Sequence, residues 1–192
     1  MRTPRRMIMT MAGLLMAAGG VLAAAPPAGA SVPGISVVAL RNLGSNKCAA
    51  PVAGPDGVIT YAGLPVQQFT CDVNNRYQTW EMWPFAYYPV NGQYVLFYQL
   101  INQGTGQCLD DRDGKTRDWS PVQQWTCNDT SSTMLWALGS FQSGAAQLLN
   151  LRAIQNGGST CLDVAHGSVD DGGVLQLYHC MDGDAAQHFF VT

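Results

Sequence analysis

The sequence predicts an all-β domain built from three similar lobes of about four short strands, each closed by its own disulfide. Three observations support this prediction. One short pattern occurs three times, six cysteines recur at regular distances from it, and the chain after residue 30 lacks the apolar period near 3.6 that marks an amphipathic helix. We expect the lobes to cover about residues 35–84, 85–139 and 140–192.

The first thirty residues have the pattern of a secretory signal peptide. Arginines at positions 2, 5 and 6 precede an apolar stretch over residues 7–22, and the small residues Ala28, Gly29 and Ala30 precede Ser31. An uncleaved membrane anchor is less favoured, because glycines interrupt the stretch and prolines follow it. The arginine pair leaves a twin-arginine route open beside general secretion. We expect residues 1–30 to be removed, leaving residues 31–192 as one secreted, extracellular domain.

The repeated pattern consists of an aliphatic residue, a glutamine, any residue, an aromatic residue, any residue and a cysteine. Three copies at similar spacing predict three units of equal local structure. The copies cover residues 66–71, 122–127 and 175–180.

All six cysteines follow residue 30, and an even number in an exported chain predicts disulfides. Each copy of the pattern ends in one cysteine, and another precedes it by 23, 19 and 19 residues. Six cysteines allow many pairings, but lobes of equal fold select the pairs within a lobe. The chain has no Cys-x-x-Cys that would favour zinc, and we expect no metal or other cofactor. The predicted disulfides are Cys48–Cys71, Cys108–Cys127 and Cys161–Cys180.

Turn-forming residues separate the predicted strands. Asn91 and Gly92 favour a hairpin turn, since both accept a positive φ, and this hairpin should join the first lobe to the second. Segments 42–46, 102–106 and 155–159 are predicted turns at matching places before the first cysteine of each lobe. Nine residues after each second cysteine stands an aromatic residue. We expect these three to fill a common core: Trp80, Trp136 and Phe189.

The charge of the domain favours neutral partners. Without the signal it has seven basic and thirteen acidic residues, a net charge of −6, and no cluster of lysine or arginine. Nucleic acid and membrane surfaces are therefore not expected as partners. Charged residues make up 12% of the chain, so amides and hydroxyls must cover much of the surface. Such groups suit sugars. The sequence says nothing about the oligomeric state.

Together these residues resemble the R-type lectins, the ricin B-chain-like β-trefoils that also occur as carbohydrate-binding modules. The resemblance rests on the repeated pattern, on Cys-Leu-Asp at 108–110 and 161–163, and on closing triplets similar to Gln-x-Trp at 78–80, 134–136 and 187–189. It implies a disulfide-closed β-trefoil with at most one shallow sugar site in each lobe. The implied partners are glycans or polysaccharides with neutral sugars, such as galactosides or xylan.

The resemblance assigns sugar-binding residues most completely in the third lobe. Asp163 would accept hydrogen bonds from two neighbouring sugar hydroxyls, and Gln176 would donate its amide. Tyr178 would pack against the C–H face of a pyranose ring. Gln187 would hold the carboxylate of Asp163. One departure is Ala186, where the family commonly has an asparagine, and an aspartate at 182 or 184 could compensate.

The second lobe keeps the equivalent residues Asp110, Gln123 and Trp125. Thr133 and Met134 stand where the family usually has an amide pair, and Met134 cannot donate to the carboxylate. In the first lobe Ala50 stands two residues after Cys48, where the other lobes have an aspartate, and Pro51 follows it, so the acceptor is absent. We expect that lobe to be structural.

Each assigned residue has an alternative role within the fold. The two aspartates could cap turns, the aromatic rings could be packed edges, and the glutamines could bond only to strand backbone. Catalysis is not predicted, because the domain has a single glutamate, Glu81, and no nucleophile or metal motif. The competing function is a protein-binding trefoil, an inhibitor or a toxin-adhesion subunit whose sugar sites have degenerated.

Overall fold

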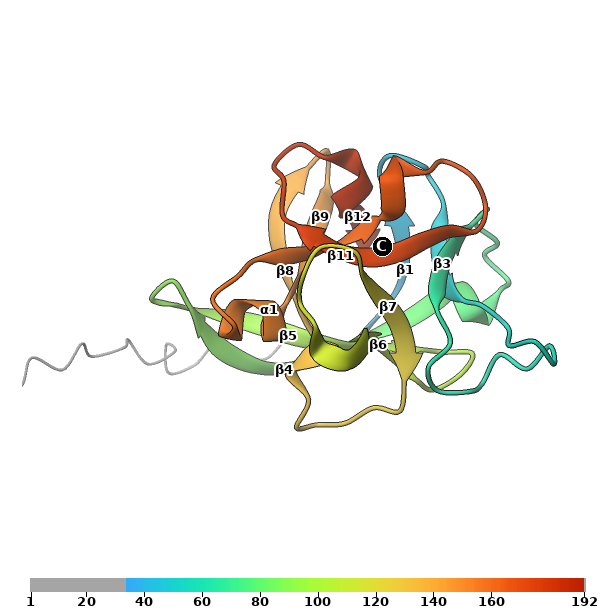
Figure 1. The fold of residues 1–192 in the computed structure, drawn as a ribbon, viewed down its shortest axis with the longest axis horizontal. Coiled ribbons are helices and arrows are strands. Elements are labelled where there is room, and N and C mark those ends of the chain that lie inside the picture. Colours follow the sequence, from blue (N-terminus) through green and yellow to red (C-terminus); the bar gives the residue numbers. More distant parts are fainter. Residues whose placement is uncertain (1–33, 192) are drawn as a thin grey trace, which may run out of the picture.

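The computed structural model describes residues 34–191, so the predicted signal at 1–30 lies outside the described residues. The described chain folds into twelve strands, and every pairing between them is antiparallel. Figure 1 shows the strands gathered around a common centre, with the long β4–β5 hairpin projecting from the body. The strands are β1 (Ser36–Asn42), β2 (Cys48–Pro51), β3 (Val66–Phe69), β4 (Thr79–Val90), β5 (Gln93–Asn102), β6 (Cys108–Asp111), β7 (Ser120–Trp125), β8 (Leu135–Gln142), β9 (Ala145–Asn150), β10 (Thr160–Val164), β11 (Gly173–His179) and β12 (His188–Val191).

The strands fall into three groups along the chain, which we call the first unit (β1–β4), the second unit (β5–β8) and the third unit (β9–β12). The first strand of each unit pairs with the last strand of the unit before it, β5 with β4 and β9 with β8. The first unit follows the third in the same way, because β1 pairs with β12. Because β11 also pairs with both β3 and β7, the sheet closes on itself. The predicted hairpin turn at Asn91 and Gly92 is confirmed, with φ values of 49° and 79°.

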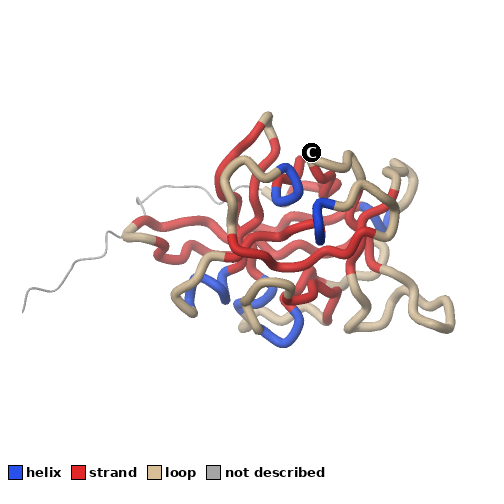
Figure 2. Tube along the Cα trace, turned by 45° about the horizontal axis from the view of Figure 1, so that its top comes forward, coloured by secondary structure: helices blue, strands red, loops and turns tan. Residues whose placement is uncertain are grey.

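Helical segments are few and short, as Figure 2 shows at the edges of the strand-rich body. The prediction of an all-β chain is confirmed apart from these segments, but the turn expected at 155–159 is preceded by a short helix, α1 (Leu151–Gln155). Asn150 caps this helix, since its Oδ1 accepts a hydrogen bond from the backbone N–H of Arg152 at 3.0 Å. Leu151 then packs with Phe97 and Leu135 in a small secondary core, which holds the helix in place. The remaining segments are single 3-10 turns at 76–78, 112–114, 132–134, 165–167 and 185–187.

The main core lies where the three units meet. Trp80, Trp136 and Phe189 are all buried within it, which confirms the prediction from their spacing. Each indole N–H also finds an acceptor: Trp80 donates to the carbonyl of Ala49 and Trp136 to that of Leu109, both at 3.0 Å. Aliphatic residues from every unit complete the core, including Leu40, Leu100, Leu109, Leu148, Leu162, Leu175 and Leu177.

The three predicted disulfides are confirmed. Cys48 pairs with Cys71, Cys108 with Cys127 and Cys161 with Cys180, and the Cα–Cα distances are 5.1, 5.0 and 5.1 Å. Each bond therefore closes a loop inside one unit, where the chain-entropy estimate of its stabilisation is about 3 kcal/mol.

A ring of buried asparagines links the units to one another. The side-chain amide of Asn42 donates to the carbonyl of Ala186, that of Asn102 to Tyr77, and that of Asn150 to Thr133. In each case the donor lies in one unit and the acceptor in the preceding one. The side-chain oxygen of the same asparagine accepts from the N–H two residues later, which fixes the following turn.

Candidate functional site

The middle hairpin of each unit places the same residue positions on one face. In the third unit, β10 pairs with β11 so that Asp163 lies opposite Gln176 and Cys161 lies opposite Tyr178. Because side chains alternate along a strand, residues two apart share a face. Asp163, Gln176 and Tyr178 are therefore brought together, as the sequence predicts. In the second unit the register is the same: Asp110 lies opposite Gln123 and Cys108 opposite Trp125.

Asp163 is a buried carboxylate with a defined partner. The amide Nε2 of Gln176 donates to its Oδ1 at 2.8 Å, and both side chains are less than a tenth exposed. Burial raises the pKa of Asp163 to about 6, although the hydrogen bond from Gln176 lowers it. The neighbouring charge of Asp184 raises this pKa further. At neutral pH the group is thus mainly ionised and can act as a hydrogen-bond acceptor.

A pocket of about 330 Å³ opens beside Asp163. One wall comes from outside the third unit: Trp119, in the loop before β7, lies with its ring centroid 5.6 Å from that of Tyr178. Sequence comparison of the lobes missed this residue, because it belongs to the preceding unit and reaches the pocket only through the fold. The pocket is lined by Trp119, Asp163, His166, Gly167, Gln176, Tyr178, Met181 and Asp184.

Gln187 makes two backbone contacts besides the expected effect on Asp163. Its amide donates to the carbonyl of His179 at 2.9 Å, and its Oε1 accepts from the N–H of Met181 at 2.8 Å. Gln78 in the first unit makes the same two contacts, with Thr70 and Asp72. Gln187 lies close enough to lower the pKa of Asp163, yet its hydrogen bonds shape the turn after β11. The glutamine of the closing triplet is therefore chiefly a turn residue.

The loop between β11 and β12 supplies one of the two aspartates considered as substitutes for the missing asparagine. Asp184 lines the pocket, while its Oδ1 accepts a hydrogen bond from the N–H of Ala186 at 2.9 Å. Asp182 is not among the residues that line it.

In the second unit the carboxylate has two side-chain donors. Gln123 donates to Oδ2 of Asp110 at 2.8 Å, and the hydroxyl of Thr133 donates to Oδ1 at 2.5 Å. Thr133 thus supplies a donor that Met134 cannot. Burial raises the pKa of Asp110, and these two hydrogen bonds oppose that effect. The hydrogen bonds found for both aspartates within residues 34–191 come from side chains, which favours a role in the site over the capping of a turn.

Trp125 lies at the mouth of a wider hollow of about 1070 Å³ beside Asp110, and its side chain is 45% exposed. The loop of the first unit approaches one edge of this ring, since a Cβ atom built on Gly63 would lie 3.2 Å from it. The exposed remainder of the ring is open to a ligand.

Next to this site lies a buried carboxylate that the repeated pattern does not predict as a site residue. Asp111 is fully buried, and its Oδ1 has no hydrogen-bond partner within residues 34–191. Its Oδ2 accepts only a long hydrogen bond of 3.3 Å, from the N–H of Thr116. Burial raises the pKa of Asp111 to about 7, and the charge of Asp110 adds to this effect.

The comparisons with known proteins fit this geometry. The sequence profile of the ricin-type beta-trefoil lectin domain matches residues 96–192. The chain belongs to this family. The match begins within β5 and includes both glutamine-paired buried aspartates, Asp110 and Asp163, whereas the first unit lies outside the matched range. A search of curated proteins finds no match to the chain.

Solved structures similar to this lectin-family chain share its fold. The designed threefold-symmetric protein ThreeFoil is 20% identical with a TM-score of 0.66, and the match covers 81% of this chain and 97% of that protein. An exo-β-1,3-galactanase from Clostridium thermocellum is 21% identical with a TM-score of 0.65, over 84% of this chain. The hemolytic lectin CEL-III is 23% identical with a TM-score of 0.56, over 81%. The chain spans only 31% of the galactanase and 30% of CEL-III.

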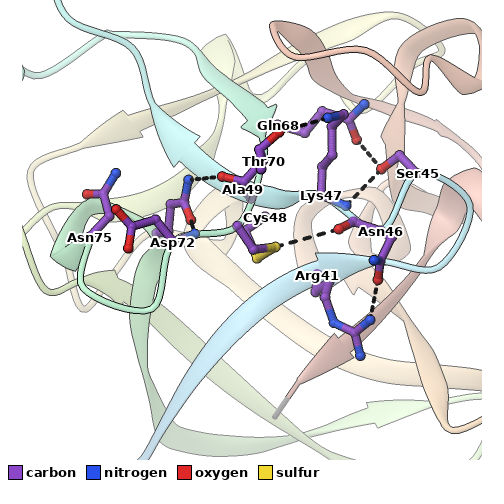
Figure 3. The surroundings of a disulfide bond; sticks show 12 residues. Arg41, Ser45, Asn46, Lys47, Cys48, Ala49, Gln68, Thr70, Asp72 and Asn75 are labelled. Atoms are coloured by element: carbon purple, nitrogen blue, oxygen red, sulfur yellow. Dashed lines mark hydrogen bonds between the residues drawn. A yellow bond between two sulfur atoms is a disulfide. The ribbon is translucent and has the colours of Figure 1, made fainter.

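The first unit of this family member has no carboxylate at the corresponding position. Ala50 lies opposite Gln67 in the β2–β3 pair, where the other units have an aspartate. Figure 3 shows the surroundings of the Cys48–Cys71 disulfide, where Gln68 accepts a hydrogen bond of 2.6 Å from the hydroxyl of Ser45. The polar groups of this region therefore bond to one another. That the first lobe is structural stays a prediction.

Two further searches of the described residues gave no result. Among residues 34–191, no group of histidine, cysteine, aspartate and glutamate side chains is arranged to hold a metal ion. The same part of the chain has no helix of the length and apolar character needed to cross a membrane.

Proposed function

We propose that the protein is a secreted, non-catalytic lectin that binds neutral sugars, such as galactosides or the xylose units of xylan. In this proposal the three units are pseudo-equivalent lobes of a β-trefoil. The third lobe carries the main site, made by Asp163, Gln176 and Tyr178. The second lobe carries a further site at Asp110, Gln123 and Trp125, and the first lobe carries none.

The contact between Gln176 and Asp163 is the observation that carries this proposal. It fixes the carboxylate beside a pocket with an aromatic wall, which is what a pyranose ring requires. Sugar hydroxyls donate to an ionised acceptor, and each such charge-assisted bond contributes about 1.5–3 kcal/mol. The apolar C–H face of the sugar packs on Tyr178. Membership of a lectin family supports the same reading.

The hydrogen bonds of the two paired aspartates support a non-catalytic role. Asp110 and Asp163 belong to separate hairpins in different units, and each is paired with its own glutamine. Glycoside hydrolysis needs two carboxyl groups facing one bond, about 5–9.5 Å apart. We therefore expect no release of reducing sugar from galactan or xylan by the purified protein.

Retention on immobilised polysaccharide tests the proposal. The purified protein should bind to galactan- or xylan-coupled resin, elute with free galactose or xylose, and pass through resin without sugar. Passage through both sugar resins, together with no signal on a glycan array, would remove the function while leaving the fold intact. Secretion is tested separately: the protein recovered from the culture medium should begin at Ser31.

A protein-binding trefoil is the second candidate, and two observations favour it. The first unit has Ala50 in place of the acceptor, and Asp110 already receives hydrogen bonds from Gln123 and Thr133. Two of three sites are thus weakened for sugar. Under this alternative the protein would pass through every sugar resin, and Asp163→Ala would leave binding to its protein partner unchanged.

A further inference from the structure

One position in each unit has the same backbone contact but a different side chain. The N–H of Gly63 donates to the carbonyl of Gln124 at 2.7 Å, and that of Gly172 donates to Gln68 at 2.8 Å. The N–H of Trp119 donates to Leu177 at 2.9 Å. The three acceptors are the third residues of the three repeated patterns. Gly63, Trp119 and Gly172 are thus equivalent, each lying in a loop that rests on the central hairpin of the next unit.

The backbone at this position favours glycine. The φ angles are 86° at Gly63, 85° at Gly172 and 62° at Trp119. A positive φ is open to glycine at no steric cost, but it is strained for a bulky residue. Two units have glycine here, so the fold itself requires no side chain. A tryptophan at the third position therefore needs a reason outside the packing of the fold.

The ring of Trp119 is not buried by the protein. It is 63% exposed, and it forms one wall of the pocket beside Asp163. The ring meets that of Tyr178 at an interplanar angle of 63°. The loop is held firmly, because Asp118 accepts hydrogen bonds from the backbone N–H of His179 at 2.6 Å and pairs with its ring at 2.9 Å. The exposed aromatic surface is thus fixed in place before any ligand arrives.

From this geometry we infer that the third-unit site holds two consecutive sugar residues of a glycan chain, with Trp119 packing against the second one. This inference rests on the proposed sugar-binding function. Two rings inclined by 63° cannot enclose one flat pyranose between parallel faces. The ring of His179 lies 4.3 Å from that of Tyr178, so the larger free aromatic surface is that of Trp119, which is 63% exposed. The first sugar lies against Asp163 and Tyr178, and its neighbour lies on Trp119.

The inferred ligand is therefore an oligosaccharide or a polysaccharide segment rather than a single sugar. A monosaccharide would contact only the Asp163 half of the pocket. The second sugar adds contact with an exposed indole, and such aromatic packing should raise affinity roughly three- to tenfold.

The variant Trp119→Gly isolates this contribution, because it gives the position the residue found in the other two units. Binding is measured by calorimetry with galactose and xylose and with their oligomers of two to four units. Parent protein should bind the oligomers more tightly than the single sugar. Trp119→Gly should lose that difference, keep its affinity for the single sugar, and retain a Tm within a few degrees of the parent. Trp83→Ala, which removes an exposed tryptophan outside the pocket, is the matched control and should behave as the parent.

The outcomes separate this inference from the proposed function. If Trp119→Gly binds oligomers as tightly as the parent, the second sugar position is wrong while the lectin function stands. If the variant loses single-sugar binding as well, Trp119 belongs to the first sugar position and the inference is again wrong. If the parent binds no sugar of any length, the proposed function and this inference both fall.

Discussion

Gln176 donates its amide to the buried carboxylate of Asp163 across 2.8 Å, and Gln123 makes the same contact with Asp110 at the same distance. The two pairs occupy identical register positions in two hairpins. The amide holds a charged group in a place where burial disfavours its charge. A fold that needed only stability would gain little from such a pair, because replacing a buried polar pair by apolar residues is often neutral.

Sugar binding should weaken as the pH falls through about 6. Burial raises the pKa of Asp163 to about 6, so the carboxyl is ionised above this pH and protonated below it. The protonated group is a poorer acceptor for sugar hydroxyls. If binding requires the ionised form, affinity at pH 5 should be roughly tenfold below that at pH 7. Calorimetry across this range measures the effect. Asp163→Asn should bind weakly at every pH, and an affinity for the parent that does not change with pH would contradict this role.

Asp111 should make the protein less stable as the pH rises. Its pKa of about 7 in the folded state lies above the ordinary value of 3.8, so folding favours the protonated form. Stability from this group is therefore fully present below pH 4 and is lost as the pH rises through 7. At pH 8 the free energy of unfolding of Asp111→Asn, measured by urea denaturation, should exceed that of the parent by about 2–4 kcal/mol. At pH 4 the two proteins should differ little.

The third unit has a valine at the position of Asp111, which suggests Asp111→Val as a second variant. Val164 in β10 aligns with Asp111 in β6, since both follow the paired aspartate. Asp111→Val should therefore fit and show the same gain at pH 8. A loss of stability in both variants at pH 8 would mean that the charge of Asp111 is satisfied in the folded protein.

The ring of asparagines tests whether the three units are equivalent. Asn42, Asn102 and Asn150 are each buried and each bond to a carbonyl of the preceding unit. Replacing any of them by alanine leaves buried backbone groups without partners, which costs about 2–4 kcal/mol. Urea denaturation of the three variants should give similar losses. One variant that is strongly destabilised beside another that is unaffected would contradict the equivalence.

The repeat predicts much of the fold because it records the same local structure three times. The disulfides, the core positions of Trp80 and Trp136 and the pairing of Asp163 with Gln176 all lie inside one unit, where constant spacing implies constant geometry. Trp119 could not be found in this way, since its contact with the pocket crosses from one unit to the next.

Departures from the repeat were harder to interpret. Aligning the lobes shows Thr133 only as the loss of an amide. In the structure its hydroxyl donates directly to the carboxylate of Asp110. The repeat does not predict helix α1, because the connection between β9 and β10 is longer than the matching connections of the other two units. The repeat does not predict the backbone contacts of Gln187, because a glutamine next to a carboxylate can also bond to backbone, as Gln78 does where no carboxylate exists.

Replacing the core Trp136 by phenylalanine tests the combined contribution of its indole volume and its hydrogen bond. Phe189 stands where the other units have Trp80 and Trp136, so a phenyl ring is compatible with this position. Trp136→Phe leaves the carbonyl of Leu109 without its donor and leaves a small cavity. The expected loss is about 2–4 kcal/mol, measured by thermal or urea unfolding. Trp83→Phe, at an exposed position, should change stability by less than about 0.5 kcal/mol, and equal losses in the two variants would contradict this account.

Calorimetric titration of the parent, Asp163→Asn and Asp110→Asn at pH 7.5, with the sugar that elutes the protein from resin, tests the central claim most directly. The account predicts that Asp163→Asn weakens binding roughly ten- to a hundredfold, because one charge-assisted acceptor is lost. Asp110→Asn should lose at most the weaker second site. Full affinity in Asp163→Asn, with its fold unchanged, would contradict the claim that this carboxylate is the sugar acceptor.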